Sequence, residues 1–578
     1  MIRGFTNDEL RRSHGCQNEE QMVFIQRWLE LFHDKTLDTY AVKMRNSLSI
    51  LQEMLATINL VLEEKAKARY IHDLKEEAIS ILVADKALHH NDPLRFLLLE
   101  ELNPQKKTDS YFELKLTIEY AIQALNINYQ DWLLDGLQQL FVTGQGTNET
   151  INTVVSFTES LASLLVNFGW SSRSLFNLVK TPRFAWENFI TGWSTFRRAL
   201  TEKGTFHGFV LVSSSEDLQK LGARVDSTQA ATREFASLET CFPTSDINNQ
   251  SYVFHKTVCT FSYNLHEAVA QCLLDYQGFA SVLKHYGCPI DQPRTVYIVL
   301  PNGRAIPYEV RAQTLAKDHL SLSDDITSRI GSLSENTRGR MNKVFRQSLL
   351  AYEATTSEVQ FSNLWIALES LVTSGSMTAG IERITGVVAS MLSANYIPRL
   401  VTNFLTDCRR CEVYPDYAGK VLSSRDPDAV RDMIKLLQDQ DEFTKFLRGC
   451  SGHALLKTRA RRLRTTMCSN ETMSKLLKDH HKRLSWHLGR LYRARNNFMH
   501  SAEADEVAPL VKHLDLYLRD MISEVLKRND GETLDLLLEK ISGNYDAIIH
   551  MLDKSSKNPI PRDIYWPWLL SGPLFVRS

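Results

Sequence analysis

Apolar side chains recur at helical spacing through residues 1–205. Phe24, Trp28 and Leu31 lie three or four positions apart, and residues 114–125 repeat the pattern. Residues at this spacing share one face of a helix, and such stripes usually form a core. Short segments rich in Asn, Pro and Gly separate the helical runs. The pattern therefore predicts a helical N-terminal region, and we find no catalytic spacing within it.

The pattern changes to short β-rich runs over residues 206–331. Runs rich in β-branched and aromatic residues occupy 209–212, 252–261, 295–300 and 305–311. Asn302 and Gly303 lie between the last two runs, and both residue types tolerate the positive φ of a tight hairpin turn. A helix at about 266–276 is expected to pack on these strands. We therefore predict a small α+β module with a β-hairpin near 295–311.

Helical spacing returns over residues 332–530. We expect helices at about 341–352, 361–372, 380–393, 396–408, 427–449, 472–497 and 508–526. Short links and apolar faces favour a bundle. In residues 531–578, a helix is expected at 534–541, and an aromatic run at 565–570 should dock on the protein, because a free tail would expose apolar surface. The predicted fold class is predominantly α, with a small α+β middle module and a C-terminal helical bundle.

Length and composition are those of an ordinary globular protein. The chain has 578 residues, too many for one core, and three or four units are expected at about 150 residues per domain. Apolar residues make up 43% and charged residues 23%, which excludes a disordered or fibrous chain. The nine cysteines are mostly isolated, so no disulfide framework is expected. Neither an N-terminal signal segment nor a run of about 18 apolar residues is visible, so we expect a soluble cytoplasmic protein without membrane contact.

Basic residues are concentrated in one part of the chain. Residues 445–495 contain 14 Lys and Arg and two acidic residues, a net charge of +12, whereas the remaining 53 basic and 66 acidic residues give −13. A basic helix can simply have a solvated face. Such a concentration within an otherwise acidic chain instead favours an anionic partner, for which the backbone of RNA or DNA is the usual choice.

The basic block ends in a hexapeptide of the form R-N-x-x-x-H, with Arg495, Asn496 and His500 at its fixed positions. A histidine can transfer a proton near neutral pH, and an arginine can hold the oxygens of a phosphate. An arginine and a histidine this close can therefore cleave RNA without a metal. This hexapeptide is the main functional hypothesis that the sequence offers.

Two other arginine–histidine pairs have a similar spacing, and about three are expected by chance in a chain with 17 histidines. Arg27 and His33 lie in a strongly apolar helix, which favours a structural role. Arg448 and His453 span two glycines, which favours a loop. The hexapeptide differs from both pairs because it closes the basic block and carries Asn at its second position.

Residues 332 to about 528 resemble the HEPN superfamily, in particular its Apea-like branch of prokaryotic defence proteins. The helix that starts at Phe361 has the pattern F-x-x-L-W-x-A-L-E-x-L, which includes Trp365 and Glu369, and the R-N-x-x-x-H motif follows about 125 residues later. The resemblance covers about a third of the chain and leaves residues 1–325 unassigned. The long basic stretch between its two parts departs from the family's pattern.

The resemblance implies a metal-independent endoribonuclease without a cofactor. His500 would take a proton from a ribose 2′-OH or donate one to the departing 5′-oxygen, Arg495 would neutralise the phosphorane oxygens, and Asn496 would orient the histidine or the phosphate. Attack by the 2′-OH makes RNA the substrate. Two HEPN modules usually form one cleft, so the resemblance also implies a homodimer or higher oligomer. The implied setting is abortive infection, in which a phage-derived trigger would release the nuclease from restraint by the N-terminal region.

Further residues are expected to support this activity. Glu369 could be a buried partner of Arg495 or of a basic neighbour, or it could be a surface residue. The residues expected to contact RNA are Arg459, Arg461, Arg462, Arg464, Lys482, Arg483, Arg490 and Arg493.

Two other function classes would use the same residues. A non-catalytic HEPN-like module would bind nucleic acid or a protein through the basic block without cleavage. In a helical scaffold, Arg495 would be an ordinary basic residue favoured near a helix C-terminus by the helix dipole, and His500 would be its solvated neighbour.

A metal-like spacing also occurs, in Cys408 and Cys411 followed by Cys450 and His453. A C-x2-C pair and a C-x2-H pair could form a tetrahedral zinc site. The first pair lies at an expected helix end, and such spacings arise readily by chance, so we assign no metal. No Walker loop, Rossmann glycine pattern or H-E-x-x-H is present, and no nucleotide or zinc-protease site is expected.

Overall fold

The computed structural model describes most of the chain from residue 5 to residue 571. The segments outside the description are 34–35, 37–41, 44, 104–110, 181–185, 187, 213–215, 244–250, 262–263, 288–292, 311–328, 332, 355, 374–380, 425, 427, 502–506, 529–530 and 556–561. The side chains of residues 498–501, 508–509, 555, 562–564, 568 and 571 also lie outside it. The chain divides into two compact units, of which the first contains residues 1–311 and 452–455 and the second contains residues 312–451 and 456–578.

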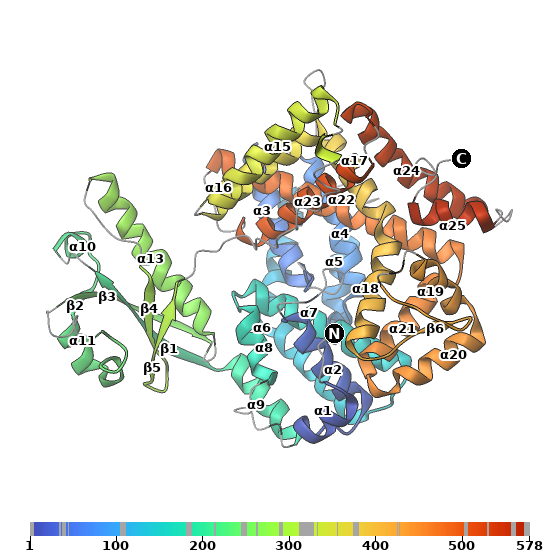
Figure 1. Ribbon diagram of the computed structural model, residues 1–578. Helices are drawn as coiled ribbons and strands as arrows, with labels where there is room; N and C mark the ends of the chain where they lie inside the picture. The colour runs from blue at the N-terminus through green and yellow to red at the C-terminus, as the bar shows by residue number, and fades with distance from the viewer. Residues whose placement is uncertain are drawn as a thin grey trace. The chain divides into compact units, whose positions relative to one another are not determined.

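The first unit begins with helices, labelled in Figure 1. They are α1 (Asn7–His14), α2 (Glu19–Leu31), α3 (Ser47–Leu62), α4 (Arg69–Ala84), η2 (Lys86–Asn91), α5 (Asp92–Glu101), α6 (Tyr111–Thr143), α7 (Asn148–Asn167), α8 (Ser172–Lys180) and α9 (Phe189–Thr201). The side chain of Asn18 caps α2 by accepting a hydrogen bond from the Gln21 amide. Phe24 packs edge-on against the rings of Phe141 and Trp193, the arrangement that aromatic quadrupoles favour.

The first unit also contains a five-stranded antiparallel sheet in the order β2-β3-β1-β4-β5 (Figure 1). Its elements are β1 (Lys203–Val212), α10 (Glu216–Lys220), β2 (Val225–Ser227), α11 (Thr228–Glu234), η4 (Ala236–Leu238), β3 (Tyr252–Phe261), α13 (Leu265–His285), β4 (Thr295–Val299) and β5 (Ala305–Glu309). β4 and β5 form a hairpin, and Gly303 in its turn has a φ of 79°. This hairpin lies where Asn302-Gly303 predicted one.

The two faces of the sheet have separate apolar cores. On one face, α13 packs so closely that a Cβ on Gly208 would lie 2.6 Å from Cys272 Sγ, so β1 needs glycine there. On the other face, Phe209 and Val253 pack with Ala231 of α11 and Leu238 of η4. The alternation of side chains along a strand explains why neighbouring residues belong to different cores.

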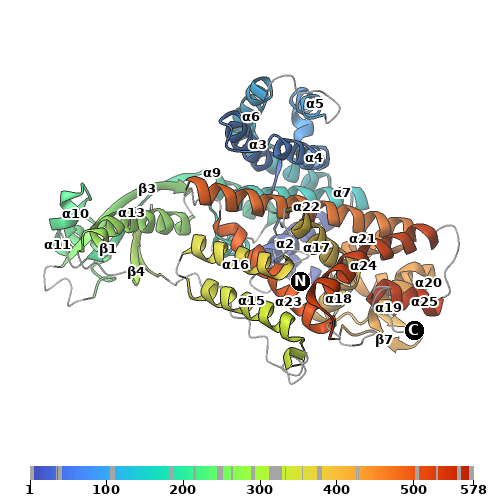
Figure 2. The same ribbon diagram turned by 90° about the horizontal axis from the view of Figure 1, so that it is seen from above.

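The second unit is a helical assembly with one short hairpin (Figure 2). Its elements are α15 (Glu335–Glu353), α16 (Ser357–Val372), α17 (Ile381–Ala394), α18 (Tyr396–Arg410), β6 (Asp416–Tyr417), β7 (Lys420–Val421), α19 (Ala429–Gln438), α20 (Gln440–Gly449), η5 (Cys450–Gly452), α21 (Ala454–Met467), α22 (Asn470–Ser501), α23 (Ala508–Arg528), α24 (Leu534–Ser555) and α25 (Arg562–Ser571). Of these, the end of η5 and the first two residues of α21 fall within the segment 452–455 of the first unit. α15 pairs with α16, α17 packs on α22 and α24, and α16 packs on α23.

The helices of this unit depart from the expectation mainly in three places. The helix expected at 427–449 is two helices, because Asp439 adopts an extended conformation and its carboxylate caps α20 by accepting from the amides of Asp441 and Glu442. α21 was not expected, because several arginines lie between its buried Leu455, Leu456 and Leu463 and obscure the apolar stripe. α24 continues to Ser555, well beyond the expected end at 541.

The aromatic run near the end of the chain docks as expected. It lies in α25, where Tyr565 and Leu569 are buried. The Tyr565 hydroxyl is 2.6 Å from Asn470 Oδ1, at the start of α22. In the described part of the chain, no helix combines the length and apolar character needed to cross a membrane.

Candidate active site

The R-N-x-x-x-H motif lies in the last turns of α22. Ser469 caps this helix by accepting a hydrogen bond from the Thr472 amide at 3.2 Å. Positions 496 and 500 are four residues apart, so they lie one turn apart on the same face. The backbone of His500 is helical, whereas its side chain lies outside the described residues. The structure therefore describes the side chains of Arg495 and Asn496, and for His500 it describes only the backbone position on the helix.

Arg495 is half-buried and contacts its neighbour in the motif. Its Nη1 donates a hydrogen bond to Asn496 Oδ1 at 3.1 Å. Among the described residues, no carboxylate forms an ion pair with Arg495. A guanidinium has five N–H donors. Asn496 therefore orients this group, whose charge is not neutralised by any carboxylate of the described residues.

Two aromatic side chains of neighbouring helices contact α22 in the turns before the motif. Tyr492, three residues before Arg495, packs against Trp365 of α16, with ring centroids 6.0 Å apart. The Trp365 side chain is fully buried. Earlier in α22, His487 Nδ1 lies 2.6 Å from the hydroxyl of Tyr517 in α23. The two sequence segments that carry the family resemblance, on α16 and α22, therefore meet in the fold through Trp365 and Tyr492.

Glu369 lies one turn after Trp365 on α16 and is half-buried. Its backbone carbonyl accepts hydrogen bonds from the amide and hydroxyl of Thr373. Within the described ranges its carboxylate forms no ion pair, either with Arg495 or with another basic residue. The role as a buried partner of Arg495 is therefore not seen in this structure.

The basic block is divided between the interior and the surface. Arg459, Arg490 and Arg493 are buried, and Arg459 Nη1 forms an ion pair of 2.6 Å with the buried carboxylate of Asp407. Arg464 Nη2 donates to Gln440 Oε1 at 2.6 Å and its guanidinium lies over the ring of Phe443. Arg459, Arg490 and Arg493 therefore belong to the interior, whereas the half-exposed Arg464 is held at the surface by Gln440 and Phe443.

A smaller part of the block faces solvent. Arg462, Lys482 and Arg483 are exposed, and Arg461 is half-exposed. The Lys482 ammonium lies over the ring of Trp486, 5.2 Å from its centroid. Of the residues predicted to contact RNA, these four have the exposure that binding to a phosphate backbone requires.

The other two arginine–histidine pairs have different environments. Arg27 is buried, and its guanidinium pairs with Glu30 at 2.7 Å and with Glu159 at 2.8 Å. Arg448 is exposed near the end of α20, and the one-turn helix η5 follows it. Arg27 is therefore structural, as expected, and Arg448 is followed by an irregular segment rather than by a continuing helix.

The residues of the metal-like cysteine–histidine spacing lie in the interior of the protein. Cys408, Cys411 and Cys450 are all buried. Burial raises the pKa of Cys450 to about 12 and that of Cys408 well above its ordinary value, so both thiols are protonated at neutral pH. In the described part of the chain, no group of three or more His, Cys, Asp or Glu is placed to hold a metal ion.

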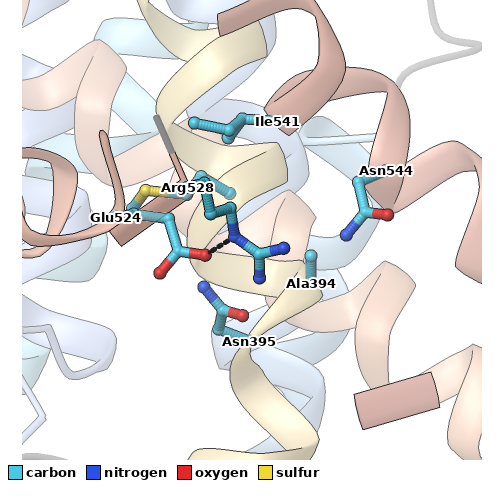
Figure 3. Close-up of a pocket in the computed structure, with 7 residues that line it drawn as sticks. Ala394, Asn395, Glu524, Arg528, Ile541 and Asn544 are labelled. Carbon is cyan, nitrogen blue, oxygen red and sulfur yellow. Dashed lines mark hydrogen bonds and ion pairs between the residues drawn. The ribbon is translucent and has the colours of Figure 1, made fainter. Parts of the chain in front are cut away.

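One small pocket lies within the second unit (Figure 3). Ala394 and Asn395 line it from one side, and Glu524, Arg528 and Asn544 line it from α23 and α24. An ion pair between Glu524 and Arg528 crosses it. Its free volume of about 10 Å³ suits one water molecule. No residue of the motif lines it, so this pocket has no part in the candidate site.

The sequence did not indicate a second polar cluster, which lies on the sheet of the first unit. His207 of β1, His255 of β3 and Asp226 of β2 form a chain of contacts. A histidine within an apolar strand is a weak signal, and the three residues come together only through strand pairing. Their arrangement could not be predicted without the register of the sheet.

Comparison of the chain with models of protein families, with curated proteins and with solved structures gives no match. The function is therefore inferred from the geometry of the motif and from the resemblance of its sequence segments.

Proposed function

We propose that this protein is a metal-independent endoribonuclease of the HEPN type, with its active site at the end of α22. The observation that carries the proposal is the state of Arg495. Its guanidinium is half-buried, oriented by Asn496, and without a carboxylate partner among the described residues. Such an arginine can bind an anionic ligand without first breaking an ion pair. A neutralised arginine such as Arg27 would have to give up its carboxylate partners.

The cleavage step needs no cofactor. The 2′-oxygen of a ribose attacks the adjacent phosphorus while His500 removes the 2′-OH proton, and the bond from phosphorus to the 5′-oxygen breaks. A proton returned to the 5′-oxygen completes the step. The products are a 2′,3′-cyclic phosphate and a 5′-hydroxyl end. Arg495 stabilises the extra charge on the phosphorane oxygens, and this interaction is stronger in the transition state than in the ground state.

One histidine cannot easily serve as both base and acid in a single step. A homodimer in which two motifs share one cleft would supply the second histidine. Arg461, Arg462, Lys482 and Arg483 would bind the RNA backbone. The first unit would act as a sensor that restrains the nuclease until a trigger arrives, as in abortive infection.

The direct test uses purified full-length protein and 5′-labelled RNA in EDTA. We expect wild type to produce 2′,3′-cyclic ends, and both Arg495→Ala and His500→Ala to lose cleavage. Lys475→Ala is the matched control, because Lys475 is an exposed basic residue on the same helix. A substrate with a single 2′-deoxyribose at the cleavage site should remain intact.

Restraint by the first unit is tested by expression in bacteria. Toxicity of wild type, and survival of cells that express His500→Ala at equal level, would support the proposal. If wild type and His500→Ala are equally harmless in cells infected with a panel of phages, and equally inactive on RNA, the ribonuclease proposal is wrong.

A non-catalytic binding module is the second candidate, and the exposed Arg462, Lys482 and Arg483 favour it equally. It predicts RNA binding that survives His500→Ala and weakens when these three charges are reversed, without cleavage under any condition.

A further inference from the structure

Three titratable side chains form a continuous chain on one face of the sheet in the first unit. Asp226 Oδ2 lies 3.2 Å from His255 Nδ1, and His255 Nε2 lies 3.2 Å from His207 Nδ1. The Thr257 hydroxyl, opposite His207 in the register of β1 and β3, is also 3.2 Å from His207 Nδ1. The side chain of His255 is fully buried, whereas that of Asp226 is 25% exposed.

This geometry selects one arrangement of protons. Asp226 as a carboxylate can only accept, so His255 carries its proton on Nδ1 and presents a lone pair on Nε2. His207 must then donate from its Nδ1 to His255. The remaining lone pair of the neutral chain is on His207 Nε2. The first added proton goes to that outer nitrogen and leaves every hydrogen bond of the chain intact.

A second added proton has no such place. It would have to go to His255 Nε2, which already faces the Nδ1–H of a charged His207. Two N–H donors and two positive charges would then meet across 3.2 Å. The two rings must separate, and a displaced His255 ring would no longer be aligned to donate its hydrogen bond to Asp226.

The other charged groups around the chain are few. Arg224, just before β2, pairs with Asp226 at 3.1 Å and with Glu234 of α11 at 2.9 Å. Burial and the charge of Arg224 lower the pKa of His255, and the nearby Asp226 opposes them. Burial likewise lowers the pKa of His207, and Glu234 opposes it. The ring of Phe235, which follows α11, lies 4.6 Å from that of His207, centroid to centroid.

We propose that Asp226, His255 and His207 form a proton-sensitive clasp that holds the edge strand β2 and helix α11 on the sheet, and that opens when both imidazoles are protonated. β2 is only three residues long and pairs with β3 alone. Few backbone hydrogen bonds therefore hold this strand once the clasp has opened. Burial lowers the pKa of both histidines below the ordinary 6.5, so the clasp is complete at pH 6.5 and above, and it opens only as pH falls through the lowered pKa values of the two imidazoles.

Hydrogen–deuterium exchange of the full chain, corrected for the intrinsic effect of pH, tests the clasp. Opening frees the His255 amide from the Arg224 carbonyl and the Thr228 amide from the Ser251 carbonyl, hydrogen bonds of 2.9 and 2.8 Å. We expect peptides over 224–238 to exchange at least about tenfold faster at about pH 5 than at pH 7.5, while β4 and β5 stay protected.

The decisive variant is His207→Gln. Without the outer imidazole, a charged His255 faces only Asp226, and protonation strengthens the contact instead of breaking it. Protection should therefore persist to a pH lower by about one unit than in wild type. Adding Asp226→Asn should abolish that gain. His285→Gln, at an exposed histidine of α13, is the control and should behave like wild type.

Loss of protection at the same pH in wild type and His207→Gln would show that no clasp exists. An equal shift in the His285→Gln control would also overturn it.

Discussion

Arg27 and Arg495 are each followed by a histidine within six positions, yet the two regions treat the arginine in opposite ways. In the first unit, Arg27 is enclosed by apolar residues, and two carboxylates neutralise it. In the second unit, Arg495 is half-buried beside an amide, with no carboxylate against it among the described residues. A buried charge must be compensated. The carboxylates of Glu30 and Glu159 already compensate the charge of Arg27, whereas the charge of Arg495 could still be compensated by an anionic ligand. The same arginine–histidine spacing therefore occurs in two different roles, and only the neighbouring side chains distinguish them.

The largest expected effect is on catalysis. Arg495→Ala should lower RNA cleavage by at least about a hundredfold, because a donor to the transition-state charge is removed. The melting temperature should change little, since no carboxylate that the structure describes pairs with Arg495. Cleavage rates and thermal unfolding of the same preparation measure both quantities. A variant that unfolds instead would make Arg495 a structural residue like Arg27.

The second prediction concerns Arg27, the neutralised arginine of the first unit. Arg27→Met removes the guanidinium from the buried carboxylates of Glu30 and Glu159, of which Glu159 also pairs with Lys43, and it should lower the free energy of unfolding by about 3–5 kcal/mol. Urea denaturation monitors the change. Arg27→Met with Glu30→Gln should recover part of the stability. Equal stability of Arg27→Met and wild type would contradict the structural role of Arg27.

A similar contrast exists within the basic block. Charge reversal of Arg462, Lys482 and Arg483 should weaken RNA binding and reduce its salt dependence, by about one unit of slope for each phosphate that is no longer bound. Arg459→Glu should instead destabilise the second unit, because the buried Asp407 would lose its ion pair of 2.6 Å with Arg459 and face a second carboxylate. Binding titrations at several salt concentrations, with unfolding curves, separate the two effects. A purely electrostatic effect of Arg459→Glu on binding would count against this division.

Acid should destabilise the second unit by a smaller amount. Burial and the nearby Arg483 and Arg399 lower the pKa of His480 to about 3, and burial with Lys512 and Arg490 lowers that of His513 to about 4. The unfolded chain binds these protons near pH 6.5 and the folded chain does not. Stability is therefore present above pH 6.5 and falls below it, by at most about 1.4 kcal/mol per pH unit for each histidine.

His480→Phe is the variant for this pH dependence. The His480 ring stacks on Tyr396 at 3.6 Å, so phenylalanine keeps the stacking and removes the titration. Melting temperatures at pH 7 and pH 5 should differ less in this variant than in wild type. An unchanged difference would show that His480 does not control the acid response.

Much of the fold followed from local patterns. The hairpin at Asn302-Gly303 formed where the turn chemistry required it, and the stripe that includes Trp365 became a buried helix face. The break at Asp439 escaped prediction because a carboxylate that caps a helix looks, in sequence, like any polar residue within a long helix. α21 escaped prediction because its apolar residues are diluted by arginines, whose interior or surface position depends on the partner that each one meets.

The sequence by itself determined the helical character, the β-hairpin and the position of the motif on a late helix, because these follow from spacing and turn residues within a few positions. Only the tertiary structure decided which arginines are neutralised, that the segments of Trp365 and Tyr492 meet, and that His207, His255 and Asp226 form a chain. Those outcomes depend on residues far apart in the chain, whose distances are set by helix packing and strand register. An arginine's charge is fixed by its chemistry, but whether that charge stays available to RNA is fixed by its neighbours.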